Sequence, residues 1–408
     1  MTQSDRIYRL YIYLMMFWAL ILPWFFIGIQ IVPGFLALVV LYKSIREKQS
    51  PIQWHPFFTL IIIYLVIRLV TTLLTPAPLR ARSVRSFIDT EWPLFSLLLL
   101  TTITIKPEDM KNILRILIFS AGLAGINSIF QFISGIDIFT GNPLGRYGNF
   151  YRAAGSYGFF LSFAGNQLMA LGMAMAFFFT EKNWRKDKYL YAIATVLIIV
   201  SLLTTFARSS WIAFVFMSLL IAIFINRRLF VINLGIILIL CAAAFILNPD
   251  LQQRFLSIFD AQKNATRLNL IHTSLAMIAD NPVTGIGSGM YGDMVPYYKY
   301  PGFYDTFCHA HNDHLQIAVI SGLPGFFAWI VLWISWFYYT IKVLKKMKKY
   351  AVQHRILTGA VLGISGILIA GFFQCYYLDL KNAIFMAFIL LVGVNAFKSQ
   401  AQKNSGTG

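Results

Sequence analysis

Long apolar stretches separated by short polar or basic segments make up most of the chain. Each stretch approaches the roughly 20 residues that a tilted helix needs to cross a bilayer. The first two are separated only by the region around Pro23 to Ile29, so they could also form one kinked unit. The pattern predicts twelve spans, at about 8–25, 27–43, 57–75, 84–104, 112–133, 158–180, 189–206, 209–226, 229–247, 314–341, 356–376 and 381–398.

Composition supports this interpretation. A chain of 408 residues that is 58% apolar and only 12% charged cannot hide its apolar surface in one soluble core, so we expect an all-α polytopic membrane protein with 1–408 as a single membrane domain. The net charge of +18 would suggest nucleic acid as a partner of a soluble protein. Here no nucleic-acid-binding motif accompanies the basic residues, which form short clusters between spans, and we predict no nucleic-acid partner.

The basic clusters alternate between the two sides of the predicted membrane. Twelve spans with a cytoplasmic N-terminus place 22 of the 34 basic residues, 14 of them lysine, on the cytoplasmic side. Arg6 and Arg9 precede an apolar run without a small-residue cleavage site, so we expect a retained first span and both termini in the cytoplasm. The opposite side holds nine arginines and only three lysines.

Topology does not explain this excess of outer arginine. A planar, permanently charged guanidinium suits bidentate binding of phosphate or carboxylate, so we predict an anionic ligand on the outer face. Contact with lipid headgroups and loop carboxylates such as Asp89 and Glu91 is the alternative. Arg208 at a tight reversal and Arg68 within a span mark functional sites by their depth, although a buried structural pair is also possible. From this group we select Arg68, Arg82, Arg85, Arg152, Arg208 and Arg267 as candidate ligand-binding residues.

The segment 248–313 is the only long loop, and loops of that size often carry function. Thr266 is predicted to cap an amphipathic helix that starts at Arg267, presents Ile271, Leu275 and Ile278 on one face, and ends at Asn281-Pro282. Arg267 in its first turn would lie beside backbone N–H groups that also favour an anion. The glycines of "NPVTGIGSGMYGD" are compatible with tight turns or with a phosphate cradle.

Three of the six histidines follow within six residues, at His309, His311 and His314. Their spacing allows a metal site, but no cysteine or glutamate pattern supports one, and we predict no metal and no cofactor. The cysteines match no metal spacing, and a Cys308–Cys375 disulfide is possible without a framework that favours it. Asn312 and Asp313 are good N-cap residues for the next helix, so His311 should precede a helix N-terminus, where the dipole favours a neutral ring that can act as a base. One or two of the histidines would then be structural.

The same residues resemble a known family. His311-Asn312, nine residues and then Gly322 resemble the histidine signature of the bacterial O-antigen ligase and O-antigen polymerase superfamily. "RLNLIHTSLAMIADNPVTGIGSGMYG" is similar to the segment that precedes this signature, "TTFARSSW" to the membrane-edge arginine motif, and "RAAGSYGFFLSFAGN" to the loop and span before it. The resemblance covers about 150–330 well. It departs from the pattern at Gly322-Leu-Pro-Gly325, where the glycine spacing is shorter by one residue.

The resemblance implies a GT-C-like glycosyltransferase fold with short helices in a long periplasmic loop. It also implies a metal-independent, inverting transfer of glycan from undecaprenyl pyrophosphate at the periplasmic face of the bacterial inner membrane. Arg208 and Arg267 would hold the diphosphate, and His311 would act on the acceptor hydroxyl with Asn312 and His314 nearby. Asp379 resembles an acidic position of the ligases, or it forms a salt bridge with one of the arginines.

Three functions stay open at this point. An O-antigen ligase, with lipid A core as acceptor in lipopolysaccharide biosynthesis, is preferred by analogy because of the clean histidine signature and the chain length. A polymerase, which extends a second lipid-linked glycan, is the alternative. A non-enzymatic carrier of lipid-linked sugar is disfavoured because no repeat relates the two halves.

Overall fold

The computed structural model describes residues 2–24, 26–181, 186–228, 249–260, 262–299, 309–348 and 351–404, with isolated positions between 229 and 248. Its elements are α1 (Gln3–Ile21), α2 (Phe26–Glu47), α3 (Pro56–Leu73), α4 (Ala77–Leu100), α5 (Pro107–Ser134), β1 (Arg146–Tyr147), β2 (Phe150–Tyr151), η1 (Gly155–Tyr157), α6 (Phe160–Thr180), α7 (Lys186–Thr204), α8 (Arg208–Phe224), α10 (Pro249–Leu256), η2 (Gln262–Asn264), α11 (Ala265–Asp280), α12 (Tyr291–Tyr298), α13 (Asp313–Leu344), α14 (Val352–Ala370) and α15 (Leu380–Asn404).

The prediction of an all-α polytopic membrane protein is confirmed. Among the described residues, eight helices are long and apolar enough to span a bilayer, and α8 is a shorter apolar helix. Every predicted span except 229–247 coincides with a helix, whereas 229–247 lies largely outside the described residues. The first two spans are separate helices, α1 and α2, rather than one kinked unit. The only strands described, β1 and β2, form a short antiparallel hairpin.

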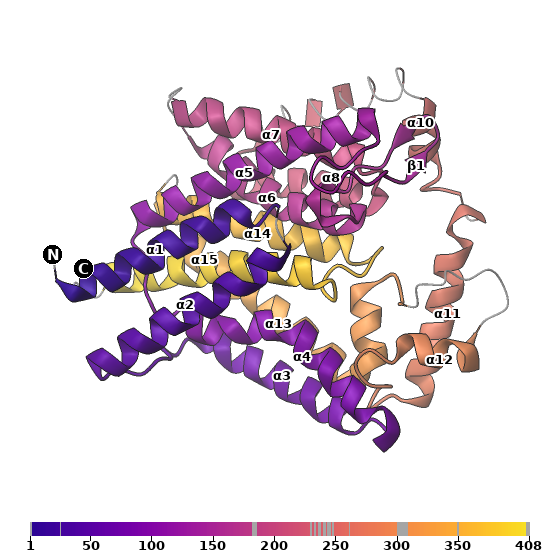
Figure 1. Cartoon of the computed structure of the whole chain (residues 1–408), viewed down its shortest axis with the longest axis horizontal. Helices are drawn as coiled ribbons and strands as arrows, with labels where there is room; N and C mark the ends of the chain where they lie inside the picture. Colours follow the sequence, from indigo (N-terminus) through magenta and orange to yellow (C-terminus); the bar gives the residue numbers. More distant parts are fainter. Residues whose placement is uncertain are drawn as a thin grey trace.

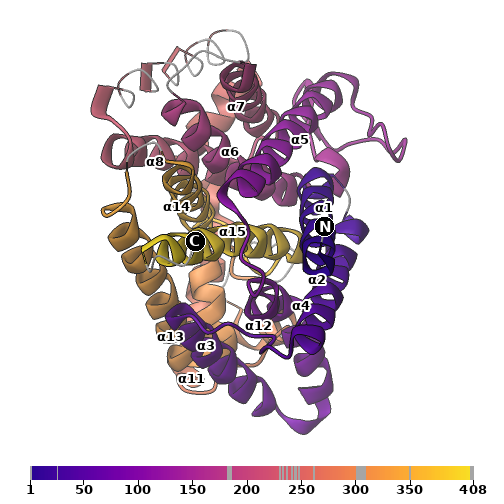
Figure 2. The ribbon, with the colours of Figure 1, turned by 90° about the vertical axis from the view of Figure 1, so that its left-hand side faces the viewer.

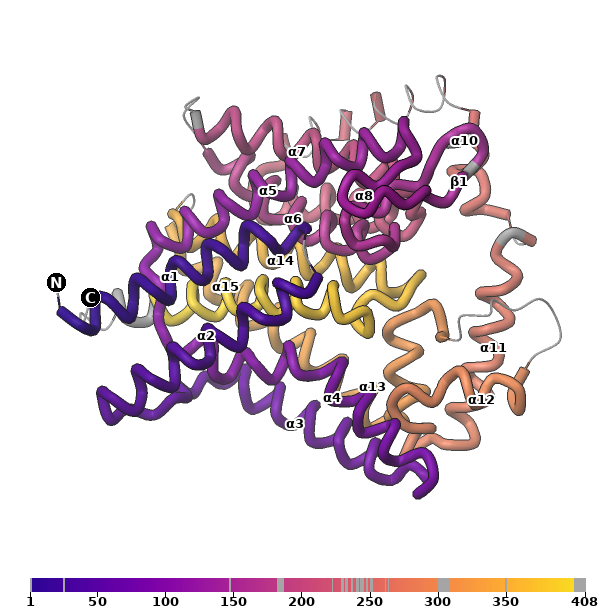
Figure 3. Tube along the Cα trace, in the orientation of Figure 1, coloured from indigo at the N-terminus to yellow at the C-terminus, as the bar shows by residue number. Residues whose placement is uncertain are grey.

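The helices form a bundle with both termini at one end. Figures 1 and 3 show the termini at the left and α10, α11 and α12 at the right-hand end. Seen from the end with the termini, α15 runs through the middle, with α14 and α6 above it and α3 below it (Figure 2). Burial agrees with this arrangement. In the most apolar 18-residue stretch of α6, and likewise of α15, 89% is buried inside the protein, whereas in that of α2 only 28% is buried. The core of the bundle is therefore α6, α14 and α15, and α2 is peripheral.

Helix α13 is broken near its start, and the break is repaired by the glycine-rich segment after α11. Gly322 has φ 65° and ψ −176°, which interrupts the helix, and Pro324 lacks the N–H that the Ile320 carbonyl would otherwise accept. The backbone N–H of Gly287 donates to that carbonyl at 3.1 Å instead, and the N–H of Ile286 donates to Val319 at 3.0 Å. These amides are committed to α13, so the phosphate-cradle alternative for this segment loses two of its donors.

This repair brings the backbone at Gly285 into direct contact with the backbone of α13, so no side chain fits at Gly285. Gly285 has φ +62°, and a Cβ there would lie 2.5 Å from the backbone nitrogen of Gly322. The docking explains how a backbone break is tolerated in an apolar helix: the protein itself satisfies the exposed groups. It also holds the segment that follows α11 against the N-terminal part of α13, on which α11 packs.

We predict that Gly285→Ala destabilises the protein by about 1–3 kcal/mol, because the new methyl group must displace backbone atoms and adopt a left-handed conformation. Denaturant unfolding of the purified protein in detergent measures the change. Gly145→Ala is the matched control, since a Cβ at Gly145 meets nothing within 4 Å. Equal stability of the two variants would contradict the proposed role of Gly285 in the backbone contact with α13.

Candidate active site

Arg208 is the first residue of α8 and follows a tight turn from α7. Phe206 in this turn has φ 53°, and Ala207 is the extended N-cap residue. The Arg208 side chain is only 7% exposed. Its Nη1 donates to the carbonyl and hydroxyl oxygens of Ser257 at 2.5 and 3.1 Å, and its Nη2 donates to Asn264 Oδ1 at 3.0 Å. Ser257 and Asn264 are neutral, so they orient the guanidinium without cancelling its charge.

Arg267 lies in the first turn of α11, as predicted, although this helix begins at Ala265 with Asn264 as N-cap residue rather than at Arg267 after a Thr266 cap. The buried face of α11 is also different from the predicted one, because Leu270, Ser274 and Met277 are buried while Leu275 is exposed. The register is set by docking against α13, which the apolar spacing alone does not reveal.

The electrostatic environment of Arg267 is unfavourable for a cation. Burial lowers the pKa of the half-buried Arg267 guanidinium, the positive charge of Arg254 lowers it further, and Tyr376 opposes the change. Among the described residues, no hydrogen bond or ion pair of the Arg267 side chain is found. A bound anion would relieve both the desolvation and the repulsion.

His311 stands immediately before the N-cap residue of α13. Asn312 is that cap, and its Oδ1 accepts the backbone N–H of Leu315 at 2.9 Å. The His311 backbone has φ 50°, a left-handed conformation that is uncommon for a residue with a side chain. Such conformations persist where surrounding contacts hold them, and they are frequent at functional sites. The ring of His309 packs against that of His311 with 4.2 Å between centroids.

The His311 ring is oriented by Gln374, in the loop between α14 and α15. Nδ1 of His311 contacts Gln374 Oε1, and the same oxygen accepts the backbone N–H of Cys375 at 3.2 Å. An oxygen that already accepts from a backbone amide is a carbonyl acceptor, so Nδ1 carries the ring proton and Nε2 is the basic nitrogen of the neutral ring. This arrangement leaves the ring in the tautomer that a general base needs.

Asp313 fixes the loop that carries Gln374. Its carboxylate accepts the backbone N–H groups of Tyr376 and Tyr377 at 3.0 Å, and its own N–H donates to the Gly371 carbonyl at 2.7 Å. Asp313 therefore joins the start of α13 to the α14–α15 loop. The hydroxyl of Tyr376 in turn pairs with Ser209 of α8 at 2.8 Å.

Arg208, Arg267 and His311 line one pocket of about 240 Å³. Asn312 lines it as well, so four of the residues selected from the sequence share this pocket. The remaining lining is mostly apolar and comes from α8, from α11 and the segment before it, from the segment before α13 and from the α14–α15 loop: Ser209, Ile212, Ile258, Asn264, Leu268, Ile271, Ala310, Phe372 and Phe373. The pocket thus combines two guanidinium groups and an imidazole with an apolar wall.

The other selected arginines lie outside this pocket. Arg68 is fully buried and forms an ion pair with Glu91, with 3.1 Å between Nη2 and Oε1. This contact is the buried structural pair that the sequence left open as an alternative to ligand binding. Arg82 pairs with Asp293 of α12 at 2.9 Å, and Arg85 lies 3.9 Å from Asp89 on the surface of α4. Arg152 donates to the Thr205 carbonyl and stacks on the Phe160 ring.

His314 and Asp379 also have structural contacts. His314 Nδ1 accepts the indole N–H of Trp329 at 3.1 Å, so Nε2 carries the proton that the Leu368 carbonyl accepts at 3.1 Å. Asp379 accepts from the Ser162 hydroxyl and from the backbone N–H of Lys381 at the start of α15, rather than from an arginine. Burial raises the pKa of the Asp379 carboxyl, and the Ser162 hydrogen bond opposes this.

Sequence reasoning missed Gln374, Ser257 and Asn264. Gln374 and Asn264 are neutral amides whose roles arise only when distant segments meet, so no local pattern marks them. Among the described residues, no group of three potential metal ligands converges, and both ring nitrogens of His314 are engaged elsewhere. Cys375 is a free cysteine among the described residues, and Cys308, its partner in the possible disulfide, lies outside them.

We predict that Glu91→Leu destabilises the protein by about 3–5 kcal/mol, because it leaves the buried Arg68 charge uncompensated. The double variant Arg68→Met/Glu91→Leu should recover at least half of this loss, since the charge itself is then gone. Unfolding of both variants in detergent measures the difference. Asp89→Asn, which breaks only the exposed pair with Arg85, is the control and should change stability by less than about 1 kcal/mol. A double variant as unstable as Glu91→Leu would refute this assignment of Arg68.

Comparison with known proteins agrees with the resemblance seen in the sequence. Residues 193–330 match the family model described as O-antigen ligase. The match contains Arg208, Arg267 and His311, together with α8, α11 and the kinked start of α13. No curated protein matches the chain. This multi-pass membrane protein therefore carries, over residues 193–330, a domain of the O-antigen ligase family, which supports its place in the O-antigen ligase and polymerase superfamily.

Proposed function

We propose that the protein is an O-antigen ligase, which transfers glycan from undecaprenyl pyrophosphate to lipid A core at the periplasmic face of the bacterial inner membrane. The coarser function, of O-antigen ligase or polymerase type, follows from the family match. The observation that supports the catalytic proposal is the pocket that Arg208, Arg267 and His311 line together. The basic clusters support the orientation, because they follow the alternation expected of cytoplasmic loops and include residues near both termini, which lie at one end of the bundle (Figure 1).

The pocket suits a diphosphate headgroup joined to an apolar chain. Two guanidinium groups can neutralise the charge of the diphosphate, and Arg267 in particular gains a partner. Phe372 and Phe373 are exposed apolar residues at the rim, 51% and 36% exposed, beside which the first isoprene units would pack. A volume of about 240 Å³ is enough for a headgroup, whereas a whole glycan would extend out of the pocket.

The proposed reaction is a single displacement at the anomeric carbon. The acceptor oxygen forms a bond to this carbon while the bond from the carbon to the phosphate oxygen breaks, which inverts the configuration and releases undecaprenyl pyrophosphate. Nε2 of His311 takes the proton of the acceptor hydroxyl. Arg208 and Arg267 stabilise the negative charge that develops on the leaving diphosphate. Gln374 keeps the proton of His311 on Nδ1, so that Nε2 can accept.

Purified protein given lipid-linked glycan, without metal or ATP, tests this proposal. Product only with lipid A core supports a ligase, and longer glycans without core support a polymerase. We expect His311→Ala to lower the rate by about 10²- to 10⁴-fold, and Arg267→Gln by about 10²- to 10³-fold. Arg146→Gln removes an exposed arginine outside the pocket and is the control. Continued translocation of lipid-linked glycan by His311→Ala, with no transfer by the wild type, would indicate a carrier.

Gln374 is a positioning residue in this scheme, and its substitution has a distinctive pH signature. Gln374→Glu places a carboxylate beside Nδ1, which favours the protonated ring, so the acid limb of the pH–rate profile should move to higher pH by about one unit. Gln374→Leu removes the acceptor and should lower the rate about tenfold or more, while donor binding is retained. A purely structural Gln374 would change the amount of folded protein without moving the profile.

A further inference from the structure

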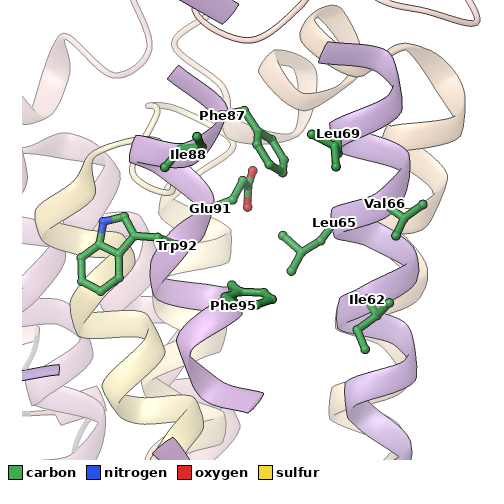
Figure 4. A pocket seen from close by; sticks show the side chains of 9 residues that line it. All are labelled: Ile62, Leu65, Val66, Leu69, Phe87, Ile88, Glu91, Trp92 and Phe95. Carbon is green, nitrogen blue, oxygen red and sulfur yellow. The ribbon is translucent and has the colours of Figure 1, made fainter. Parts of the chain in front are cut away.

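A second cavity lies between α3 and α4, well separated in sequence from the elements that build the candidate active site. It has a volume of about 320 Å³ and is lined by Ile62, Leu65, Val66, Leu69, Phe87, Ile88, Glu91, Trp92 and Phe95. Figure 4 shows the two helices side by side, with the Glu91 carboxylate, Leu65, Phe87 and Phe95 in the space between them. Several lining side chains are exposed, among them Val66 at 51% and Phe95 at 62%. The groove therefore opens sideways between α4 and α3, which is long and apolar enough to span a membrane.

The one charged group in the lining presents no uncompensated charge to an occupant. Glu91 is 1% exposed and is paired with Arg68, while the hydroxyl groups of Tyr64 and Tyr377 also donate to its carboxylate. The surface that an occupant meets is thus hydrocarbon. Within a bilayer, hydrocarbon chains are the abundant partners for such a surface.

The headgroup end of the groove is basic. Arg80 is seven residues before Phe87, and Arg85 is seven residues before Trp92, so both arginines continue the groove-lining face of α4 toward its N-terminus. The rise of a helix places Arg80 about 10 Å above Phe87, and Arg85 about 15 Å above Phe95. Both arginines are exposed, Arg80 donates to the Thr75 carbonyl, and Arg85 has only the weak surface contact with Asp89.

We propose that this groove binds an anionic phospholipid, with one acyl chain between α3 and α4 and the phosphate at Arg80 and Arg85. Charge complementarity selects the occupant: a neutral zwitterionic lipid offers the same chain but gains less from two guanidinium groups. The site does not depend on the transfer reaction and uses none of its residues. It would place an anionic lipid on α4, next to the Arg82–Asp293 pair that joins α4 to α12.

Trp92 provides a direct probe, because it lines the groove. The protein is reconstituted in phosphatidylcholine vesicles that contain a small fraction of brominated phosphatidylglycerol or, in parallel, of brominated phosphatidylcholine. The quenching due to Trp92 is the difference between the wild type and Trp92→Phe. We expect quenching by phosphatidylglycerol to exceed that by phosphatidylcholine at equal mole fraction, with an apparent selectivity of about fivefold for each arginine that contacts the phosphate.

Variants separate the two parts of the site. Arg80→Gln/Arg85→Gln should remove the selectivity, whereas Arg82→Gln, which removes the same charge from another face of α4, should keep it. Val66→Phe fills the groove and should lower Trp92 quenching by both lipids, whereas Val70→Phe, a comparably exposed position outside the lining, should not. Equal quenching by the two lipids in the wild type would overturn the proposal. A Trp92 shielded from both lipids would overturn it as well and would indicate that a second protein surface covers the groove.

Discussion

The candidate active site depends on the junction that the Asp313 carboxylate makes with the backbone of Tyr376 and Tyr377. This buried carboxylate satisfies two amides of an irregular, buried part of the loop, where unpaired backbone groups are costly. Because Asp313 is the first residue of α13, the junction ties the loop to the turn that holds His311. Gln374 then contacts the imidazole, Phe372 and Phe373 line the same pocket, and α8 and α11 contribute its arginines. The His311 ring so placed has little freedom to turn, which suits the role we propose for it, and its backbone keeps an uncommon left-handed conformation.

The buried arginines show two solutions to one physical problem. The buried charge of Arg68 is neutralised by Glu91. Such a pair fixes the position of the two side chains and leaves no charge to bind a ligand. Arg267 lies in a pocket wall where the positive charge of Arg254 lowers its pKa, and the proposed diphosphate would offset this repulsion. Burial alone therefore does not separate an internally paired arginine such as Arg68 from one that could hold an anion, as we propose for Arg267. The charges around each guanidinium distinguish these two cases.

Much of the fold could be predicted from the sequence, because apolar run length and alternating basic loops are direct consequences of bilayer thickness and of topology. That Arg208, Arg267 and His311 share one pocket was also predictable in outline, because a local sequence pattern marks each of the three residues. The role of Arg68 was not, because its partner Glu91 lies in another span and only the packing of α3 on α4 brings them together. Nor was the role of the glycine segment, whose amides satisfy carbonyls released by the break at Gly322 in a helix more than thirty residues later. Neutral amides such as Gln374 leave no local trace at all.

The central claim is that the arginine pair and the imidazole act together on one diphosphate-linked donor. A cryo-EM structure of the protein in a bilayer with undecaprenyl pyrophosphate tests it most directly. We predict diphosphate density between the guanidinium groups of Arg208 and Arg267, with Nε2 of His311 facing the position of the anomeric carbon from the side opposite the leaving group. A diphosphate bound elsewhere, with Arg267 making no contact to it, would contradict the account.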